Sequence, residues 1–378
     1  MKVGLISAYP PAEGGVSSRM YWTAKYLGKK GVEVVVLTDS WSWEENYKEQ
    51  IDFDELKYLQ PKNVSVYQIN PLEIKKKKQV GKRGNNETLL FSLGLEIDKK
   101  ENPDIWYSYY LLPYGLVGYF LSKKTNKPWV LGHASSDLER LGHPDYVNLI
   151  DVVREADAVI SRSEEMKLIT DKVVEPDIQQ ICSLPEEFNI DRDYNERPII
   201  GCIGKENYSK RWRELLESLE DTKYFRISFF CDKEGRRNLS KIIELKKLDK
   251  EIKFNNFVPP WRMPEVYSKI DILYNGEKGF YISKHHPLVP LEGFASGCCN
   301  ILSDELFEKY ENIFDLEDEE NVIKVDTLNK DKIKDTFHHL DKKQISEIGR
   351  KGKRMFYKKN DYEGYINFLF DIFEDLVR

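Results

Sequence analysis

The sequence predicts an α/β protein made of two Rossmann-like, doubly wound parallel-sheet domains that face each other across a cleft. The chain has 378 residues, which exceeds the size at which a single hydrophobic core usually stops growing. Short apolar, β-branched runs alternate with amphipathic helical stretches, as in parallel sheets covered by helices. The alternation stops at the polar stretch 191–197 and then restarts, which indicates a second domain.

Thirteen apolar runs are expected to be strands. Those of the first domain lie at residues 3–7, 32–38, 64–69, 104–110, 128–134, 156–161 and 179–184. Those of the second domain lie at residues 198–204, 224–232, 252–258, 269–276, 298–304 and 321–326.

The domain limits follow from these runs. We expect a first domain at 1–192, a second at 197–355, and a helical segment at 356–378 that packs back on the first domain. The last segment is strongly helical, because its apolar side chains recur at helical spacing. These side chains are Tyr365, Phe368, Leu369, Ile372, Phe373 and Leu376.

Composition excludes several classes of protein. The formal net charge of −6 argues against attraction of the whole chain to nucleic acid. The five cysteines are odd in number and follow no framework spacing, as expected in a reducing compartment; adjacent Cys298 and Cys299 are interpreted as packing residues. No apolar segment is long enough to span a bilayer, and the first residues lack a signal-peptide layout. A cytoplasmic protein is expected, with attachment to the inner membrane face kept as an option.

The turn after the first predicted strand contains Gly14 and Gly15. Without a Cβ, two glycines allow backbone N–H groups to approach a ligand closely. The helix that follows adds its positive N-terminal end, so phosphate is the natural ligand. A plain tight turn is the alternative, because neither a dinucleotide fingerprint nor a P-loop is present.

Lys205 and Lys210 flank the loop after the first strand of the second domain. Two ammonium groups there would match a diphosphate that faces the Gly14–Gly15 turn across the cleft. The alternative is a solvated basic helix start. Cations at a helix N-terminus oppose the helix dipole, which favours the functional interpretation.

Glu292 lies in an otherwise apolar run that leads into the small-residue sequence GFASG. Glutamate is seldom buried without a partner, and the hydroxyl groups of a sugar would supply one. A capping or surface glutamate is an equally good interpretation of this residue alone.

Taken in order, these segments resemble the retaining nucleotide-sugar glycosyltransferases of family 4, which have the GT-B architecture. The resemblance rests on YPPAEGGVSS at 9–18, on Lys205 with Lys210, and on Glu292 with its GFASG continuation. Weaker similarities are DIWYSYYLLPYG, LGHASSD, ADAVISRSEE and FVPPWRMPEVYSKIDILYN. The matched order extends from residue 1 to about residue 305.

The resemblance implies a role for each matched position. Gly14 and Gly15 would approach the donor diphosphate, and Lys205 and Lys210 would neutralise it as it leaves. Glu292 would hold the ribose hydroxyls, and the amides of Leu288 and Val289 would contact phosphate. His133 would lie near the reacting sugar and the acceptor, although an ordinary strand-end histidine remains the alternative.

The resemblance also implies glycosyl transfer with retention and no metal cofactor. The chain shows no acidic pair or His/Cys cluster with metal-ligand spacing, and neighbouring His285 and His286 would not converge on one ion. No pair of carboxylates suited to double displacement is visible either. The co-substrate would be a nucleoside-diphosphate sugar.

One position departs from the family pattern. Lys284 stands where the family has the first glutamate of a pair whose second member is Glu292, and Lys205 replaces an arginine. Three explanations stay open. In the first, Lys284 pairs with an anionic donor sugar such as a uronic acid. In the second, the local alignment is shifted and Glu277 or another group serves instead. In the third, catalysis is lost and the protein only binds nucleotide sugars.

The acceptor is the least defined substrate. The family places it on the first domain, where the basic block Lys75–Lys78 with Lys82 and Arg83 would suit anionic lipid headgroups or a lipid-linked pyrophosphate. A solvated flexible loop is the favoured alternative. Trp41, Trp43 and Tyr47 would suit sugar stacking or simple packing. A glycan or lipid-linked acceptor is therefore expected, with peripheral membrane contact as an option.

Other functions remain compatible with two such domains. Sugar-nucleotide epimerases and phosphorylases share the fold, and a fold alone does not give a function. No cofactor-lysine segment of a phosphorylase can be located. A catalytically degenerate nucleotide-sugar-binding protein or an epimerase therefore remains as the alternative.

Overall fold

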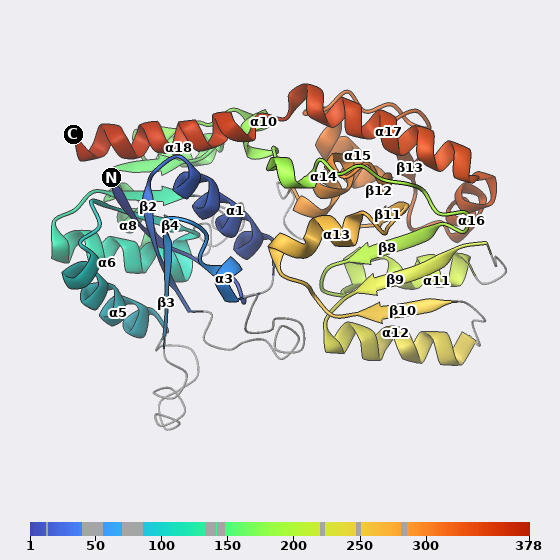
Figure 1. The fold of residues 1–378 in the computed structure, drawn as a ribbon, viewed down its shortest axis with the longest axis horizontal. Coiled ribbons are helices and arrows are strands. Elements are labelled where there is room, and N and C mark those ends of the chain that lie inside the picture. The colour runs from blue at the N-terminus through green and yellow to red at the C-terminus, as the bar shows by residue number, and fades with distance from the viewer. Residues whose placement is uncertain are drawn as a thin grey trace. The chain divides into compact units, whose positions relative to one another are not determined.

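The computed structural model describes residues 1–12, 14–39, 56–69, 86–132, 141, 148–219, 224–246, 251–280 and 286–378. The chain forms two compact units, each with its own parallel sheet (Figure 1). Met1–Ile181 and Glu363–Arg378 form the first unit, and Cys182–Tyr362 form the second.

The first unit contains a seven-stranded sheet in the order β3-β2-β1-β4-β5-β6-β7, and all its strands are parallel. The strands are β1 (Lys2–Ile6), β2 (Glu33–Thr38), β3 (Val64–Gln68), β4 (Ile105–Tyr109), β5 (Trp129–Gly132), β6 (Ala158–Ile160) and β7 (Val173–Val174). After their first residue, β1 and β2 are buried throughout and mostly apolar, as expected for strands covered on both faces.

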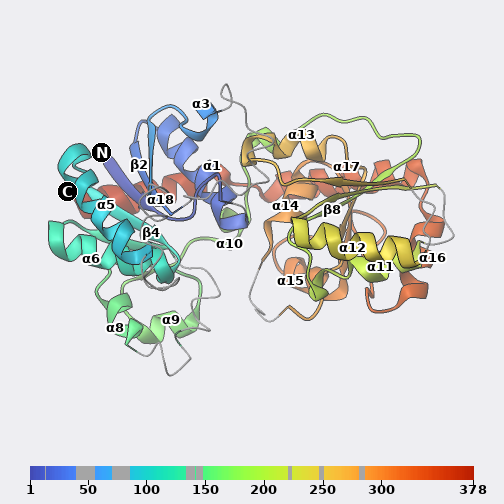
Figure 2. The ribbon, with the colours of Figure 1, turned by 90° about the horizontal axis from the view of Figure 1, so that it is seen from below.

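Helices cover both faces of this sheet. α5 (Asn86–Glu101) and α6 (Leu116–Thr125) lie side by side in both views and share one apolar core with Trp106 and Trp129 (Figures 1 and 2). α1 (Gly15–Lys29) packs near β2 and β3. The shorter helical segments are α3 (Leu56–Leu59), η1 (Leu111–Gly115), α8 (Leu149–Arg154), α9 (Glu164–Ile169) and α10 (Ile178–Ile181).

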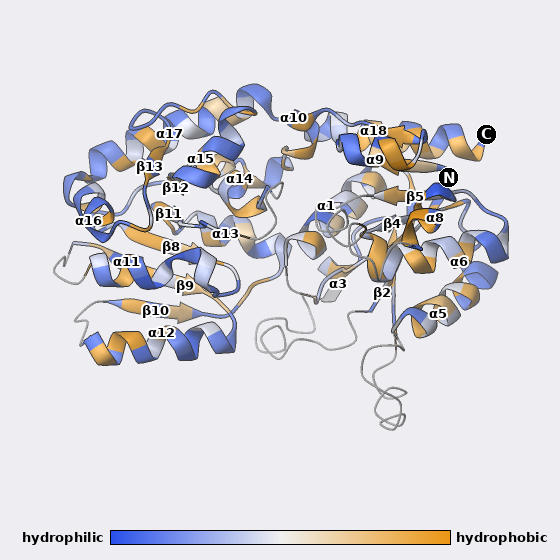
Figure 3. Ribbon diagram, turned by 180° about the vertical axis from the view of Figure 1, so that it is seen from behind, coloured by the Kyte–Doolittle hydropathy of each residue, from blue (hydrophilic) through white to orange (hydrophobic). Residues whose placement is uncertain are grey.

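The second unit contains a six-stranded parallel sheet in the order β10-β9-β8-β11-β12-β13. The strands are β8 (Ile199–Ile203), β9 (Arg226–Phe230), β10 (Ile252–Asn255), β11 (Ile272–Asn275), β12 (Cys299–Ser303) and β13 (Ile323–Val325). All six predicted strands of this unit are confirmed. Figure 3 shows hydrophobic colours along most strands of both sheets.

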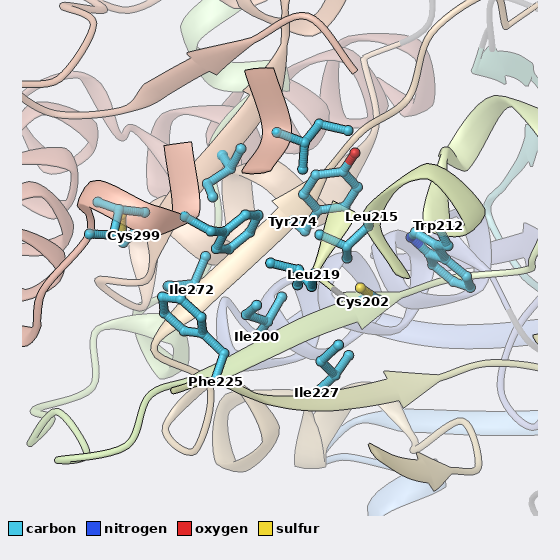
Figure 4. Close-up of a cluster of buried hydrophobic side chains, with 14 of the residues drawn as sticks. Ile200, Cys202, Trp212, Leu215, Leu219, Phe225, Ile227, Ile272, Tyr274 and Cys299 are labelled. Atoms are coloured by element: carbon cyan, nitrogen blue, oxygen red, sulfur yellow. The ribbon is translucent and has the colours of Figure 1, made fainter. Parts of the chain in front are cut away.

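The core of the second unit lies between this sheet and the helices α11 (Trp212–Ser218), α12 (Lys233–Lys246) and α16 (Lys330–His339). Trp212, Leu215 and Leu219 point from α11 toward Ile200, Cys202 and Ile272 of the strands (Figure 4). On the other face, α14 (Leu288–Ala295) packs against β12, and α17 (Lys342–Lys359) packs against both. The remaining helical segments are η3 (Glu186–Phe188), η4 (Tyr208–Lys210), η5 (Pro260–Arg262), α13 (Met263–Tyr267) and α15 (Asp304–Glu311).

The division between the units falls at Ile181–Cys182, earlier than the polar stretch 191–197 suggested. The reason is a set of hydrogen bonds that attach this stretch to the second unit. The Tyr194 hydroxyl donates to the Gly297 carbonyl over 2.7 Å, and the Asn195 side chain donates to Asp271 over 2.8 Å. Polar composition here therefore reflects buried hydrogen bonding and not a linker.

One predicted strand is wrong. Residues 179–184 were expected to be a strand, but α10 ends at Ile181 and the residues after it are irregular. The strand at this edge of the first sheet is the two-residue β7, which pairs with β6. Leu184 is buried, and its backbone N–H and carbonyl both bond to the Asn360 side chain. The apolar character of 179–184 thus comes from burial outside the sheet.

The last helix, α18 (Tyr362–Val377), belongs to the first unit from Glu363 onward. The predicted helix is confirmed, but α17 ends at Lys359, so the segment 356–378 is not one helix. Phe373 packs against Tyr107 of β4, with ring centroids 5.3 Å apart. Lys30 donates to Asn367 over 2.6 Å. The apolar stripe of α18 therefore has a partner in the first sheet, and Lys30, directly after α1, adds a polar contact.

Candidate functional site

The strand order reverses at one place in each sheet, beside its first strand. In the first sheet the reversal lies between β1 and β4, and in the second it lies between β8 and β11. Ligands of open parallel sheets bind outside the carboxyl ends of the strands at this point. The loops that begin there, at residues 7, 110, 204 and 276, are therefore the candidate binding loops.

Gly204 opens the loop after β8 with a φ of 130°. This backbone conformation is strained for a residue with a Cβ, so glycine is required here. A Cβ at this position would lie 3.6 Å from Cε of Lys210 and 3.9 Å from its Nζ. The glycine thus leaves backbone exposed beside an ammonium group.

Lys210 forms an ion pair with Glu277, the second residue after β11. Nζ of Lys210 lies 2.7 Å from Oε2 of Glu277. The Glu277 side chain is 3% exposed and the Lys210 side chain is 19% exposed. A carboxylate buried this deeply requires a charged or hydrogen-bonding partner. The pair therefore fixes a partly accessible ammonium at the reversal point of the second sheet.

Lys278 connects the turn that contains Glu277 to neighbouring elements. The Nζ of Lys278 lies 2.8 Å from Asp304 at the start of α15 and 3.0 Å from Asp326 after β13. The hydrogen bond to Asp304 raises the pKa of Lys278, and the bond from Lys278 lowers the pKa of Asp326. In addition, the N–H of Gly279 donates to Glu305 over 2.6 Å. The backbone around Glu277 is thus anchored to two further elements.

The N-terminus of α14 lies in the same unit and presents free amides. Leu288 and Val289 occupy its first two positions, and Pro290, which has no N–H, occupies the third. The preceding residue, Pro287, provides no side-chain cap. Helix geometry leaves the first N–H groups without an intrahelical partner. Two amide donors at the positive end of a helix suit a negatively charged ligand.

Glu292 lies one turn further along α14 and is buried. The hydroxyl of Tyr267, at the end of α13, donates to its Oε2 over 2.6 Å. Burial raises the pKa of the Tyr267 hydroxyl, and the Glu292 charge raises it further, so this hydroxyl stays protonated and remains a donor. The sequence suggested a sugar hydroxyl as the partner of Glu292. Tyr267 supplies one partner within the chain itself.

In the first unit, Gly14 and Gly15 stand at the start of α1. Gly14 has φ 123° and ψ 168°, and no atom of the described residues beyond its chain neighbours lies within 4 Å of where its Cβ would be. The first turn of α1 contains no acidic residue and has no side-chain cap. The buried hydroxyls of Ser7 and Ser17 find no hydrogen-bond partner in the described part of the chain. Open space, free amides and unsatisfied hydroxyls are what an anion site requires.

Sequence reasoning missed Asp39, which follows β2 on the first unit. Its Oδ1 accepts a 2.8 Å hydrogen bond from the hydroxyl of Tyr114, which is buried in η1. Burial raises the pKa of Asp39 above its usual value. The position of Asp39 in the sequence could have drawn attention to it, because it directly follows a predicted strand and ligand-binding residues gather at strand ends.

The predicted site residues do not all come together. Lys210 contacts Glu277 and lies beside Gly204, Leu288, Val289 and Glu292 share α14, and Gly14 and Gly15 stand at the start of α1 in the first unit. Lys205 is exposed and forms no ion pair with a described residue. The residues outside the described part of the chain are His133, Lys284, Trp41, Trp43, Tyr47, Lys75–Lys78, Lys82, Arg83 and His285.

Among the described residues, no group of three or more His, Cys, Asp or Glu side chains is placed so that it could hold a metal ion. None of the described helices combines the length and the apolar character needed to cross a bilayer.

No protein-family model matches the chain, and no curated protein matches its sequence. Solved structures do match over nearly the whole chain. Sucrose-phosphate synthase from Thermosynechococcus elongatus superposes with a TM-score of 0.66 at 15% identity, over 99% of this chain and 98% of its own. HepE from Anabaena, solved with UDP-glucose, gives 0.64 at 12% identity, over 99% and 100%.

A third match is a mutant of TarM from S. aureus, solved with UDP, fondaparinux and α-GlcNAc-glycerol. It superposes with a TM-score of 0.69 at 12% identity, over 99% of this chain and 100% of its own. At these identities the similarity shows the fold alone. Two parallel-sheet α/β units in this order are the GT-B fold.

Proposed function

We propose that this protein is a retaining glycosyltransferase that moves a sugar from a nucleoside-diphosphate sugar to an acceptor hydroxyl without a metal. The observation that carries the proposal is the ion pair between Lys210 and Glu277, 2.7 Å long, at the reversal point of the second sheet. It supplies a fixed cation where a parallel sheet binds its ligand. The similar structures solved with UDP or UDP-glucose support a nucleotide-sugar ligand.

In this proposal the second unit binds the donor. Lys210 and the amides of Leu288 and Val289 bind the diphosphate, because a cation and the positive end of a helix both favour anionic oxygens. Glu292 accepts hydrogen bonds from the ribose hydroxyls. Its buried position and its bond from Tyr267 hold the carboxylate ready to accept them.

The reaction breaks the bond between the anomeric carbon and the β-phosphate oxygen. The acceptor oxygen bonds to the same face of that carbon, and its proton leaves with the nucleoside diphosphate. Negative charge grows on the diphosphate in the transition state, so a preorganised cation lowers the barrier. Lys210, and Lys205 once a ligand is bound, fill this role. For Gly14 and Gly15 at the diphosphate, and for His133 at the reacting carbon, the proposed roles rest on the sequence resemblance alone.

The buried Glu277 supports one of the three explanations for Lys284. A carboxylate that directly follows β11 and pairs with Lys210 is well suited to serve as the first glutamate of the pair. The donor sugar then has no need of a negative charge. Lys284→Ala tests this choice. Equal loss with neutral and acidic donor sugars contradicts an anionic donor, whereas selective loss of a uronic acid donor supports it.

The first test is thermal stabilisation by a panel of nucleoside diphosphates and their sugars, uronic acids included. A ligand that binds the native state raises the unfolding midpoint according to its affinity. We expect one nucleotide to raise it and Lys210→Ala to abolish the effect. Arg213→Ala is the matched control, because it removes the same charge from a side chain that is 69% exposed on α11. No shift with any nucleotide contradicts the proposal.

Turnover separates the transferase from the alternatives. A transferase releases the nucleoside diphosphate and yields a product that carries the sugar. A degenerate binding protein shows the thermal shift but releases no diphosphate. An epimerase converts the sugar nucleotide when no acceptor is added.

The first unit is expected to bind a glycan or lipid-linked acceptor. A comparison of binding with and without anionic vesicles tests the proposed membrane contact.

A further inference from the structure

Arg211 has a backbone conformation that its side chain does not favour. It directly follows Lys210 and is the N-cap of α11, with φ 55° and ψ 28°. This left-handed region is disfavoured for residues with a Cβ, and glycine is the usual choice. Strained residues of this kind persist where the surrounding structure holds them, often at functional sites.

The Arg211 guanidinium points into the protein. Its side chain is 19% exposed, and Nη2 donates to the carbonyl of Lys278 over 3.2 Å. Nη1 reaches Glu214 over 3.4 Å. Its Nε is buried without a partner among the described residues. The guanidinium of Arg211 therefore contacts the backbone next to Glu277, and most of the side chain is shielded from solvent.

Four contacts join two turns of the second unit, and Arg211 makes one of them. We name these four contacts the clasp. One turn is 208–211 after β8, and the other is 277–279 after β11. The clasp consists of Lys210 with Glu277 at 2.7 Å, the Lys278 N–H with the Ser209 carbonyl at 2.9 Å, Arg211 with the Lys278 carbonyl at 3.2 Å, and the Tyr208 hydroxyl with the Gly279 carbonyl at 3.2 Å. The clasp thus connects the two turns through both side chains and backbone.

We infer that Arg211 is a positioning residue for the anion site and acts through Lys210 and Glu277. Its left-handed backbone sets the direction in which the chain leaves Lys210, and its guanidinium holds the peptide that follows Glu277. A glycine would supply the backbone conformation without strain, so what the arginine adds at this position is its side-chain contact. This inference rests on the proposed function, because the site it orders is the donor diphosphate site.

Arg211→Gly separates the backbone from the side chain. Glycine adopts the left-handed conformation without strain, and this gain offsets its greater freedom in the unfolded chain and the lost contacts, so the thermal midpoint should stay close to that of the wild type. The clasp loses its guanidinium contact, so the affinity for a diphosphate should fall about 5- to 10-fold, the effect of about one net hydrogen bond. The probes are UDP, ADP and pyrophosphate, measured by titration calorimetry. Arg213→Ala is the control for lost charge and should bind all three normally.

A double-mutant cycle with Lys210→Ala tests whether Arg211 acts through Lys210. We expect Arg211→Gly to cause no further loss of affinity once Lys210 is absent. Losses that multiply would mean that Arg211 contacts the ligand independently, which overturns the inference. Arg211→Lys adds a second check. It retains the charge but not the planar fork, so it should bind as weakly as Arg211→Gly, and full recovery also overturns the inference.

The outcomes distinguish this inference from the proposed function. If the wild type binds none of the three probes, the proposed function fails and the inference fails with it. If the wild type binds and Arg211→Gly binds equally well, only the inference is overturned. Should Arg211→Gly fail to fold, Arg211→Asn replaces it, because asparagine tolerates the left-handed region.

Discussion

The hydroxyl of Tyr267 donates a 2.6 Å hydrogen bond to the carboxylate of Glu292, and both side chains are buried. The two residues lie on different helices, α13 and α14, and are 25 positions apart in the sequence. The bond orients the one acidic side chain of α14 that is expected to meet the donor. Its loss should therefore affect stability and ligand binding in separable ways.

Tyr267→Phe should lower the free energy of unfolding by about 1.5–3 kcal/mol, the usual worth of a hydrogen bond to a charged group. The carboxylate of Glu292 stays buried but loses its donor. Urea unfolding measures the loss. Tyr224→Phe is the control, because its ring is 41% exposed and it should cost less than 0.5 kcal/mol. A change below 0.5 kcal/mol for Tyr267→Phe as well would mean that the bond contributes nothing to stability.

Glu292→Gln should have little effect on stability, because the amide oxygen still accepts from Tyr267. It should weaken binding of the donor nucleotide about 10-fold, because a neutral acceptor replaces a charged one. The wild type should prefer the ribonucleotide over its 2′,3′-dideoxy analogue, and the variant should lose that preference. Calorimetric titration with both ligands measures this. A preference that survives in the variant places the ribose elsewhere.

Lys278→Met should lower the stability of the second unit by about 0.5–1 kcal/mol, a small value because Lys278, Asp304 and Asp326 are partly exposed. The folded pKa of Asp326 is below 3.8, so its contribution is present above that pH and is lost as the pH falls through the folded value. The folded pKa of Lys278 is above 10.5, so its contribution is lost only as the pH rises beyond it. Urea unfolding at a series of pH values from 7 downward should show a difference between wild type and variant that is largest at pH 7 and becomes smaller in acid.

Gly14→Ala and Gly15→Ala form a matched pair. Gly14 has φ 123° and ψ 168°, so alanine there should cost about 1–3 kcal/mol through backbone strain alone, since no atom of the described residues beyond its chain neighbours lies within 4 Å of the new Cβ. Gly15 begins α1, where alanine should be neutral or stabilise by up to about 1 kcal/mol. If the diphosphate approaches this turn, Gly15→Ala should weaken nucleotide binding without loss of stability. Unchanged binding would remove Gly15 from the site.

Thiol labelling should report on the second unit alone. All five cysteines lie between Cys182 and Cys299, within the second unit, and all are buried. Burial raises the pKa of the Cys231 thiol to about 12, so its reactive thiolate is scarce at neutral pH. An aromatic disulfide reagent should label none of them quickly in the native protein and five after the second unit unfolds. Rapid labelling of native protein would contradict the burial.

The fold was largely predictable because strand runs of the second unit are continuous and apolar and end in polar or glycine residues. The prediction failed at 179–184, where apolar side chains are buried outside the sheet, and it missed β7, which has only two residues. Neither error could be corrected from local pattern, since both depend on what packs nearby.

The site was predictable to the extent that its residues follow strand ends. The sequence singled out Lys210 by its position after a strand and Glu292 as a carboxylate in an apolar run, and it named Glu277 only as an alternative; their roles stay predictions. The pairing of Lys210 with Glu277 spans 67 positions and depends on β8 lying beside β11, which the local sequence does not specify. Arg211 gave no signal, because only its dihedral angles and its contact with the Lys278 carbonyl distinguish it.

The first unit is made of two pieces of chain, and α18 supplies the second piece. A ribosome therefore finishes the whole of the second unit before it delivers the helix that covers Tyr107 of the first sheet. During that interval the face of β4 opposite α6 lacks its cover and is open to chaperones or to wrong partners. A chain cut after Tyr362 should accordingly fold its second unit and leave the first one exposed to proteases, although the cut removes nothing from the first 181 residues.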